Sequence, residues 1–140
     1  MFSFTNIAAY HKDLESGSVT CMQAVTHYLS QIDKNERLNA FTEVFAEEAV
    51  SKAASLDEQR KKGQALNKLH GVVIAIKDVI CYKGHKVTAA SGILKGFESL
   101  YTASALQYLL DEDAIVIGVC NCDEFAMGST NENSVYGKVL

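Results

Sequence analysis

The 140-residue chain contains no proline, although about 5% is usual in proteins. This absence excludes proline-rich linkers, and the sequence also has no internal repeat or low-complexity tract. No apolar run approaches the ~20 residues needed to cross a bilayer. The N-terminus has no basic region before its apolar residues, which is atypical of a signal peptide. We therefore expect a soluble, cytoplasmic protein with no membrane partner.

The chain also has little positive charge and few cysteines. Its net charge of −4 and pI near 5.5 argue against a dedicated nucleic-acid surface, and the lysines form no run longer than RKK at 60–62. Of the four cysteines, Cys120 and Cys122 form a lone C-x-C with no second pair at zinc spacing. We expect reduced structural thiols and no metal site.

What the chain does contain is ordinary globular composition, 48% hydrophobic and 21% charged, enough for one domain. Its beginning predicts helices. Ser3 or Thr5 is expected to cap a first helix, and Gly17 suits the left-handed exit at its end. Thr20 and Gln23 have the spacing of a capping box, which predicts the start of a second helix.

A short extended piece, LNAFTEV at 38–44, precedes a third helix that is predicted over about 45–62 and ended by Gly63. Residues at helical spacing are expected to face a core rather than a ligand. They are Ile7, Tyr10, His11 and Leu14 in the first helix, Val25, Tyr28, Leu29 and Ile32 in the second, and Ala49, Val50, Ala53 and Leu56 in the third.

The second half of the chain changes to an α/β pattern. Residues 72–76 have the length and branching of a strand buried on both faces, and 114–120 predict a second fully apolar strand. Between them lie a long loop and a helix that Thr102 is expected to cap, with Asp113 in a left-handed exit position. The helix carries Leu106, Leu109 and Leu110. A strand, a helical crossover and a strand predict a parallel pair with a right-handed connection.

Lys77 follows the first apolar strand without any turn signal. Its stem can simply lie along the strand end while the ammonium reaches water and Asp78 balances the charge. However, ligands collect at the carboxyl ends of parallel strands, and the second strand ends at Asn121, before a polar loop with Gly128, Ser129, Thr130, Asn131, Asn133 and Ser134. This loop is equally compatible with a solvated turn and with a substrate loop.

Several segments, in order and at the expected spacing, resemble the amidase signature family. They are LHGVVIAIKDVI at 69–80, TAASGIL at 88–94, the helix after it and IGVCNCDEFAMGSTNENSVYG at 117–137. Within that family, LNAFTEV and DEFAMGSTNENS look most like the A subunits of the glutamyl-tRNA(Gln) amidotransferases. The sequence departs from the family at Val73 and Lys138, where proline is usual.

The resemblance implies an α/β fold, in which N-terminal helices precede the start of a parallel or mixed sheet with helices on both faces. It implies that residues 1–140 are the N-terminal part of a single amidase domain, helical over 1–66 and α/β over 67–140.

The family is known for a Ser–cis-Ser–Lys triad, so the resemblance makes Lys77 the base that acts through the middle serine on the nucleophilic serine. Lysine in water has a pKa of roughly 10.4. We expect the apolar strand to keep Lys77 desolvated enough to lower that pKa. The resemblance assigns Met127, Gly128, Ser129 and Thr130 to a substrate-side loop. The Gly/Ser-rich segment that carries the two serines in the family is not found in this sequence.

The resemblance therefore implies an N-terminal fragment, inactive alone, of a subunit that hydrolyses glutamine to release ammonia. The B and C subunits of the amidotransferase would be its partners and complete the enzyme. By the same resemblance, a partner subunit uses ATP and Mg to activate Glu-tRNA(Gln), and a small third subunit braces the two. This chain is expected to bind no cofactor and to meet tRNA only indirectly. The fragment is expected to self-associate. The alternatives are another amidase-signature hydrolase of small amides, or a non-catalytic interaction module. The reading frame beyond Leu140 discriminates between enzyme and module.

Overall fold

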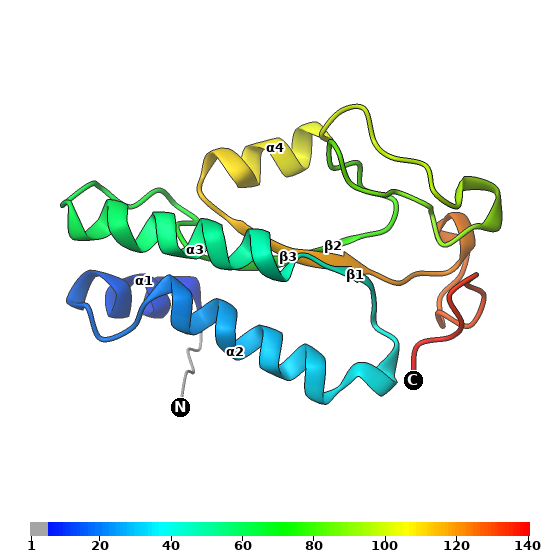
Figure 1. The fold of residues 1–140 in the computed structure, drawn as a ribbon, viewed down its shortest axis with the longest axis horizontal. Coiled ribbons are helices and arrows are strands. Elements are labelled where there is room, and N and C mark those ends of the chain that lie inside the picture. The colour runs from blue at the N-terminus through cyan, green and yellow to red at the C-terminus, as the bar shows by residue number, and fades with distance from the viewer. Residues whose placement is uncertain (1–5) are drawn as a thin grey trace. The chain divides into compact units, whose positions relative to one another are not determined.

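The structure, a computed structural model, describes residues 6–140 (Figure 1). Its helices are α1 (Ile7–Ser16), α2 (Cys21–Lys34), α3 (Ala46–Lys61) and α4 (Ser104–Asp111), with short 3-10 helices η1 (Glu36–Leu38), η2 (Gly92–Leu94) and η3 (Glu124–Ala126). Its strands are β1 (Phe41–Val44), β2 (Val73–Lys77) and β3 (Ile115–Cys120). The fold class predicted from the sequence, α/β with a mixed sheet, is confirmed.

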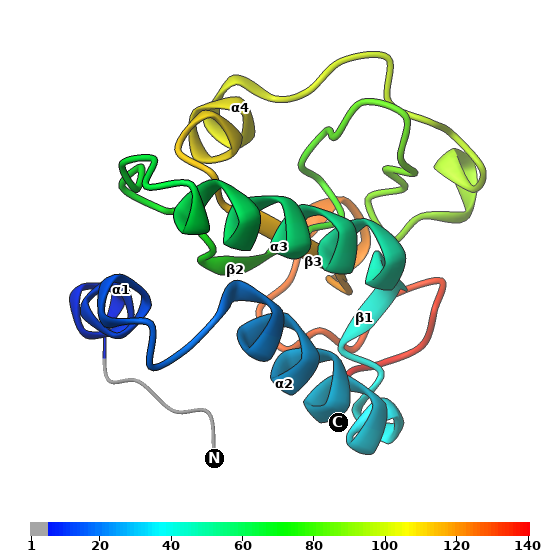
Figure 2. The ribbon, with the colours of Figure 1, turned by 60° about the vertical axis from the view of Figure 1, so that its left-hand side comes forward.

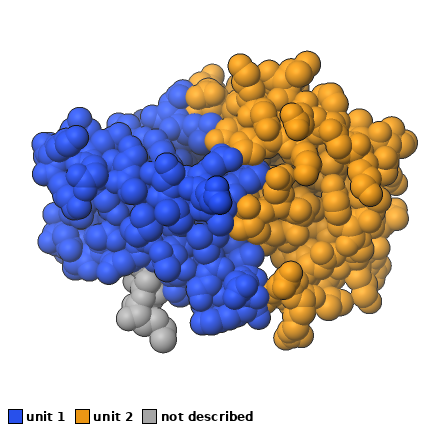
Figure 3. Space-filling model, in the orientation of Figure 1, with its two compact units in different colours: residues 1–34, 45–74, 109–117 blue, residues 35–44, 75–108, 118–140 orange. Residues whose placement is uncertain are grey.

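The chain forms two compact units, coloured separately in Figure 3. Unit 1 contains the described residues up to Lys34 together with 45–74 and 109–117. Unit 2 contains 35–44, 75–108 and 118–140. Within residues 6–140, no helix is long and apolar enough to cross a membrane.

The helix starts of unit 1 depend on side-chain caps. The Asn6 side chain caps α1 by accepting a hydrogen bond from Ala9 N at 2.9 Å; Ser3 and Thr5, the caps expected from the sequence, lie outside the described residues. The predicted capping box of α2 is confirmed. Thr20 N donates to Gln23 Oε1 and Gln23 N donates to Thr20 Oγ1, both at 3.0 Å.

A buried carboxylate from α3 completes the start of α2. Asp57 accepts hydrogen bonds from Cys21 N at 2.9 Å and Met22 N at 3.0 Å, so α3 satisfies two donors that the helix itself cannot. The two helices pack against each other (Figures 1 and 2). This cap between helices fixes the register of α2 on α3.

The core of unit 1 closes around Gly71. Tyr10 Oη donates to Gly71 O at 3.1 Å. Gly71 has φ +73°, and a Cβ there would overlap Cys21 Sγ. Burial raises the pKa of Cys21 to about 12 and also raises the pKa of Tyr10. Only glycine fits this position without rearrangement.

Most core residues predicted for the helices are correct. The buried ones are Tyr10, Leu14, Val25, Ala49, Ala53 and Leu56, while Tyr28, Leu29, Ile32 and His11 are half-buried. The prediction is wrong for Ile7 and Val50, which are exposed. Ile7 lies in the first turn of α1. Val50 lies one position from Ala49, about 100° around the helix from the stripe that Ala49 and Ala53 define.

The sheet has the strand order β1-β3-β2. β1 is antiparallel to β3, with Phe41 opposite Cys120 and Val44 opposite Gly118. β2 and β3 run in the same direction, because Ile115 N donates to Val72 O at one end and Asp78 N donates to Cys120 O at the other. The predicted parallel pair is therefore confirmed.

Two expectations for this half of the chain are wrong. β3 is buried over residues 115–119, but β2 is only partly covered, with Ala75 and Lys77 exposed. β2 is an edge strand of the described sheet, whereas β3 is flanked by β1 and β2. Thr102 does not cap α4; its hydroxyl accepts a hydrogen bond from Lys83 N. Asp113 has φ +66°, as predicted.

The side chain of Asn39 holds the last residues of unit 2 through hydrogen bonds. Asn39, in the left-handed region, donates from Nδ2 to the carbonyls of Tyr136, Gly137 and Lys138 at 2.9, 3.1 and 3.2 Å. Leu140 N also donates to the carbonyl of the residue before Asn39. The segment 136–140 is thus attached to the stretch that leads into β1.

Candidate active site

Lys77 and Asn121 lie at the same edge of the sheet. Lys77 is the last residue of β2, and its carbonyl accepts hydrogen bonds from Val79 N at 2.7 Å and Ile80 N at 2.9 Å, so the chain turns at once. The bond from Asp78 N to the last residue of β3, at 3.1 Å, places Asn121 beside this turn. The side chain of Lys77 is exposed, which corrects the expectation that β2 by itself desolvates it.

Asp78 does not serve to balance the charge of Lys77. Its side chain is 2% exposed and accepts hydrogen bonds from Thr88 N at 2.8 Å, Ala90 N at 2.9 Å and the Thr88 hydroxyl. Its carbonyl accepts a fourth bond from Ala89 N at 2.7 Å. A buried carboxylate is costly unless it is fully hydrogen-bonded, and the turn at 88–90 supplies those donors.

Four non-glycine residues near this turn adopt the left-handed conformation. They are Ala89, Ala90, Phe125 and Ala126, with φ between +50° and +58°. Such a conformation costs an L-residue roughly 1–2 kcal/mol, and strain of this kind is concentrated at functional sites. The two segments bond to each other, because Phe125 N donates to Ala89 O at 2.8 Å and Val135 N donates to Ala90 O at 2.9 Å.

Asp123 organises the loop that contains Met127, Gly128, Ser129 and Thr130. Its carboxylate accepts hydrogen bonds from Asn131 N at 2.9 Å and Asn133 N at 3.0 Å. These bonds lower the pKa of Asp123, and the positive charge of Lys77 acts in the same direction. A Cβ on Gly128 would overlap Asp123 Oδ2. The loop is therefore wrapped tightly around one carboxylate, while residues 127–130 are exposed.

The other polar residues of the site have structural partners. Asn121 is buried, donates to Asn39 O and Gly137 O at 3.1 and 3.0 Å, and accepts from the Ser134 hydroxyl at 2.7 Å. The Ser91 hydroxyl donates to Glu124 Oε1 at 2.6 Å. Asn121 thus acts as a brace of the loop.

Among residues 6–140, no cluster of His, Cys, Asp or Glu could hold a metal ion. The cysteines are all reduced thiols, and burial raises the pKa of both Cys120 and Cys122. An amine at a strand end can take a proton from a hydroxyl brought to it once that strand end is covered and the amine is desolvated. That is the chemistry this arrangement offers.

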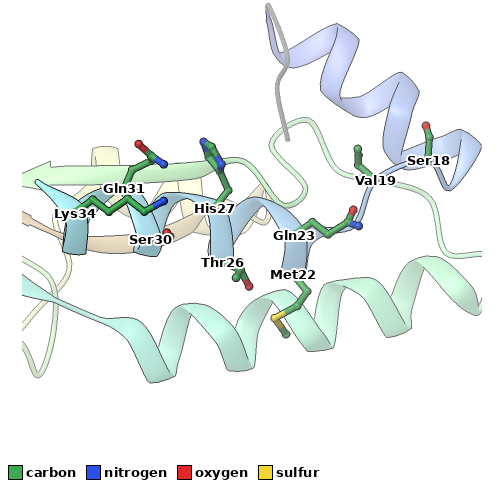
Figure 4. Close-up of a pocket in the computed structure, with 9 residues that line it drawn as sticks. All are labelled: Ser18, Val19, Met22, Gln23, Thr26, His27, Ser30, Gln31 and Lys34. Atoms are coloured by element: carbon green, nitrogen blue, oxygen red, sulfur yellow. The ribbon is translucent and has the colours of Figure 1, made fainter. Parts of the chain in front are cut away.

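A separate groove of about 610 Å³ runs along α2 in unit 1 (Figure 4). All its lining residues come from 18–34, and none of them is a candidate catalytic or substrate-side residue. Met22 points toward α3, while His27 and Gln31 point away from it. The groove is therefore separate from the site at Lys77.

Solved structures of amidases share the α/β fold of this chain. The chain aligns with a peptide amidase from Stenotrophomonas maltophilia at a TM-score of 0.86 and 27% identity, over 98% of this chain and 29% of that one. It aligns at a TM-score of 0.89 and 30% identity with a chain of a vestigial protein complex that reveals the evolutionary origins of an s-triazine catabolic enzyme, over 95% of this chain and 30% of that one.

The particular family follows from the sequence. The profile of the Amidase family matches residues 23–140, and the chain belongs to this family. It is 48% identical over 126 residues to the A subunit of the glutamyl-tRNA(Gln) amidotransferase of Chlorobaculum tepidum, which is 90% of this chain and 26% of that protein. The corresponding protein of Chloroflexus aggregans is 42% identical over 134 residues, 95% of this chain and 28% of that protein. The chain spans little more than a quarter of these relatives.

Sequence reasoning placed Lys77 correctly at the edge of the sheet where the parallel strands end, but it gave Asp78 only a charge-balancing role and missed Asp123. Asp78 had a signal, since a second charged residue directly after an apolar strand and Lys77 is unusual. Asp123 had another, because it follows β3 and precedes a loop rich in backbone donors. That Lys77 is the base, and that residues 127–130 contact substrate, stay predictions.

Proposed function

We propose that this chain is the lysine-bearing part of a glutamine amidohydrolase, the A subunit of a tRNA-dependent amidotransferase. The complete protein releases ammonia from glutamine. Its partners are the B and C subunits: one uses ATP, Mg and that ammonia to convert Glu-tRNA(Gln) to Gln-tRNA(Gln) in the cytoplasm, and a small third subunit braces the two. The similarity to such A subunits over 90% of the chain is the observation that carries the proposal.

In this proposal Lys77 is the general base. The two serines come from polypeptide outside these 140 residues, and Lys77 reaches the nucleophilic serine through the middle one. Because Lys77 is exposed here, the same polypeptide has to cover the strand end and desolvate the amine. Met127, Gly128, Ser129 and Thr130 form the substrate side, held by Asp123.

The test is glutamine hydrolysis by the complete protein with Lys77 replaced. Lys77→Arg keeps the charge but cannot lose a proton at neutral pH, so it should be nearly as inactive as Lys77→Ala. Lys68→Arg, at a lysine that is exposed in unit 1, is the matched control and should keep wild-type activity. Substantial activity in Lys77→Arg would mean that this lysine is structural.

The 140-residue chain alone should hydrolyse no glutamine, because it lacks the serines and an oxyanion hole. It should also self-associate through its partly covered edge strand β2. Glutamine hydrolysis and light scattering measure both properties. Glutaminase activity from these residues alone would contradict the proposal.

A second candidate is an amidase that acts on another small amide. The alignment with a peptide amidase over 98% of the chain favours it. Comparing glutamine with C-terminal peptide amides as substrates of the complete protein separates the two.

A further inference from the structure

We infer that Asp78 is a positioning residue: through the turn at 88–90 it fixes the loop carrying Met127 to Thr130 relative to Lys77. The inference deepens the proposed function, on which the importance of that loop rests. Its basis is a chain of hydrogen bonds within unit 2 that starts one residue after the candidate base.

The first link is the carboxylate itself. Asp78 is bound to β3 through its own N–H and to the turn through both carboxylate oxygens, one accepting from Thr88 N and the other from Ala90 N and the Thr88 hydroxyl. At 2% exposure, water cannot replace these partners. The position of the turn is therefore set by the residue adjacent to Lys77.

The second link is the conformation of the turn. With Ala89 and Ala90 both left-handed, their carbonyls are presented to the later loop, where they accept from Phe125 N and Val135 N. The Thr88 hydroxyl lies 3.0 Å from Tyr136 Oη. The left-handed conformation is unfavourable for alanine, so it is held by the hydrogen bonds of Ala89 and Ala90 to Asp78 and to the later loop.

The third link is the loop. Phe125 and Val135 flank residues 127–130, and Asp123 and Asn133 close the loop between them. A loop anchored on both sides to the turn moves with the turn. The carboxylate of Asp78 accepts its hydrogen bonds from residues 88 and 90, so it acts on Lys77 and on the loop indirectly.

Hydrogen exchange on the 140-residue chain tests this inference without requiring activity. Asp78→Asn is isosteric but places an NH₂ group against a backbone or hydroxyl donor. The amides of Phe125 and Val135 should exchange about tenfold faster, while those of α2 and α3 in unit 1 keep their protection. Glu98→Gln, at an exposed carboxylate in the segment between β2 and α4, is the matched control and should change neither.

Unchanged exchange at Phe125 and Val135 would overturn the inference, and so would equal acceleration in α2 and α3, because Asp78 would then act only through overall stability. If Asp78→Asn does not fold, Thr88→Val replaces the hydroxyl that bonds Asp78 by a methyl group of similar size. It should speed exchange of the same two amides, whereas Thr88→Ser, which keeps the hydroxyl, should leave them protected.

In the complete protein, the substitution Asp78→Asn should raise the KM for glutamine about tenfold and lower kcat by a smaller factor. This is the result expected when a loop is misplaced but the base is intact. A fall in kcat alone would overturn the positioning role. If the complete wild-type protein hydrolyses no glutamine, the proposed function fails, while hydrogen exchange still decides the role of Asp78.

Discussion

Replacing Gly71 by alanine should destabilise unit 1 far more than the same change at another left-handed glycine. Gly63 is the matched control, since it has φ +76° and nothing within 4 Å of its added Cβ. Gly63→Ala should therefore cost only the left-handed strain, roughly 1–2 kcal/mol. Gly71→Ala carries the same strain, at φ +73°, and adds a clash.

The clash can be sized from its neighbours. The new Cβ would overlap Cys21 Sγ and lie 3.0 Å from Tyr10 Oη, and both side chains are essentially fully buried. Overpacking of this kind costs about 1–3 kcal/mol. Together with the strain, Gly71→Ala should lower the free energy of unfolding by about 2–5 kcal/mol.

Urea unfolding of the wild type, Gly71→Ala and Gly63→Ala measures these differences. The double variant Cys21→Ala/Gly71→Ala removes the nearest atom and should recover part of the loss, which a double-mutant cycle detects as coupling. If Gly71→Ala costs no more than Gly63→Ala, the space around Gly71 is not closely packed and the reasoning is refuted.

Three further outcomes are expected. Gly128→Ala should displace the loop from Asp123, lower the free energy of unfolding by about 1–3 kcal/mol and speed amide hydrogen exchange within the loop. Unchanged exchange there would contradict the close contact between Gly128 and Asp123. Asp57→Asn should weaken the cap of α2 and cost about 0.5–2 kcal/mol in urea unfolding, whereas Asp33→Asn, at an exposed site of α2, should not. Burial lowers the pKa of His70 below its ordinary 6.5, so the unfolded chain binds more protons and stability should fall as pH drops below that value. His70→Gln should flatten the plot of stability against pH below 6.5. An unaltered slope would mean that other groups cause the pH dependence.

The sequence was most informative where structure depends on neighbouring residues. The capping box of Thr20 and Gln23, the left-handed Gly17 and the buried strand β3 all follow from local rules and are confirmed. The shared edge of Lys77 and Asn121 also followed, because a parallel pair fixes which strand ends meet.

The sequence was least informative where contacts between residues far apart in the chain determine conformation or exposure. Nothing local marks Ala89 and Ala90 as left-handed, since bonds to Asp78, ten to twelve positions away, impose that conformation. The exposure of Lys77 depends on what packs over an edge strand, which an apolar run cannot reveal. Val50 was misassigned because one helical position separates a buried stripe from solvent.

The three hydrogen bonds of Asn39 have a consequence for synthesis of the chain. They join residues 97 to 99 positions apart, so Asn39 leaves the ribosome long before its acceptors. At about 5–20 residues per second, it waits roughly 5–20 s for them. For most of that interval β1 also lacks its partner, because the β3 residues that pair with it lie 74 to 79 positions later in the chain. The helices α2 and α3 can pair earlier, so we expect unit 2 to be completed last during translation, with the unpaired β1 exposed to chaperones until then.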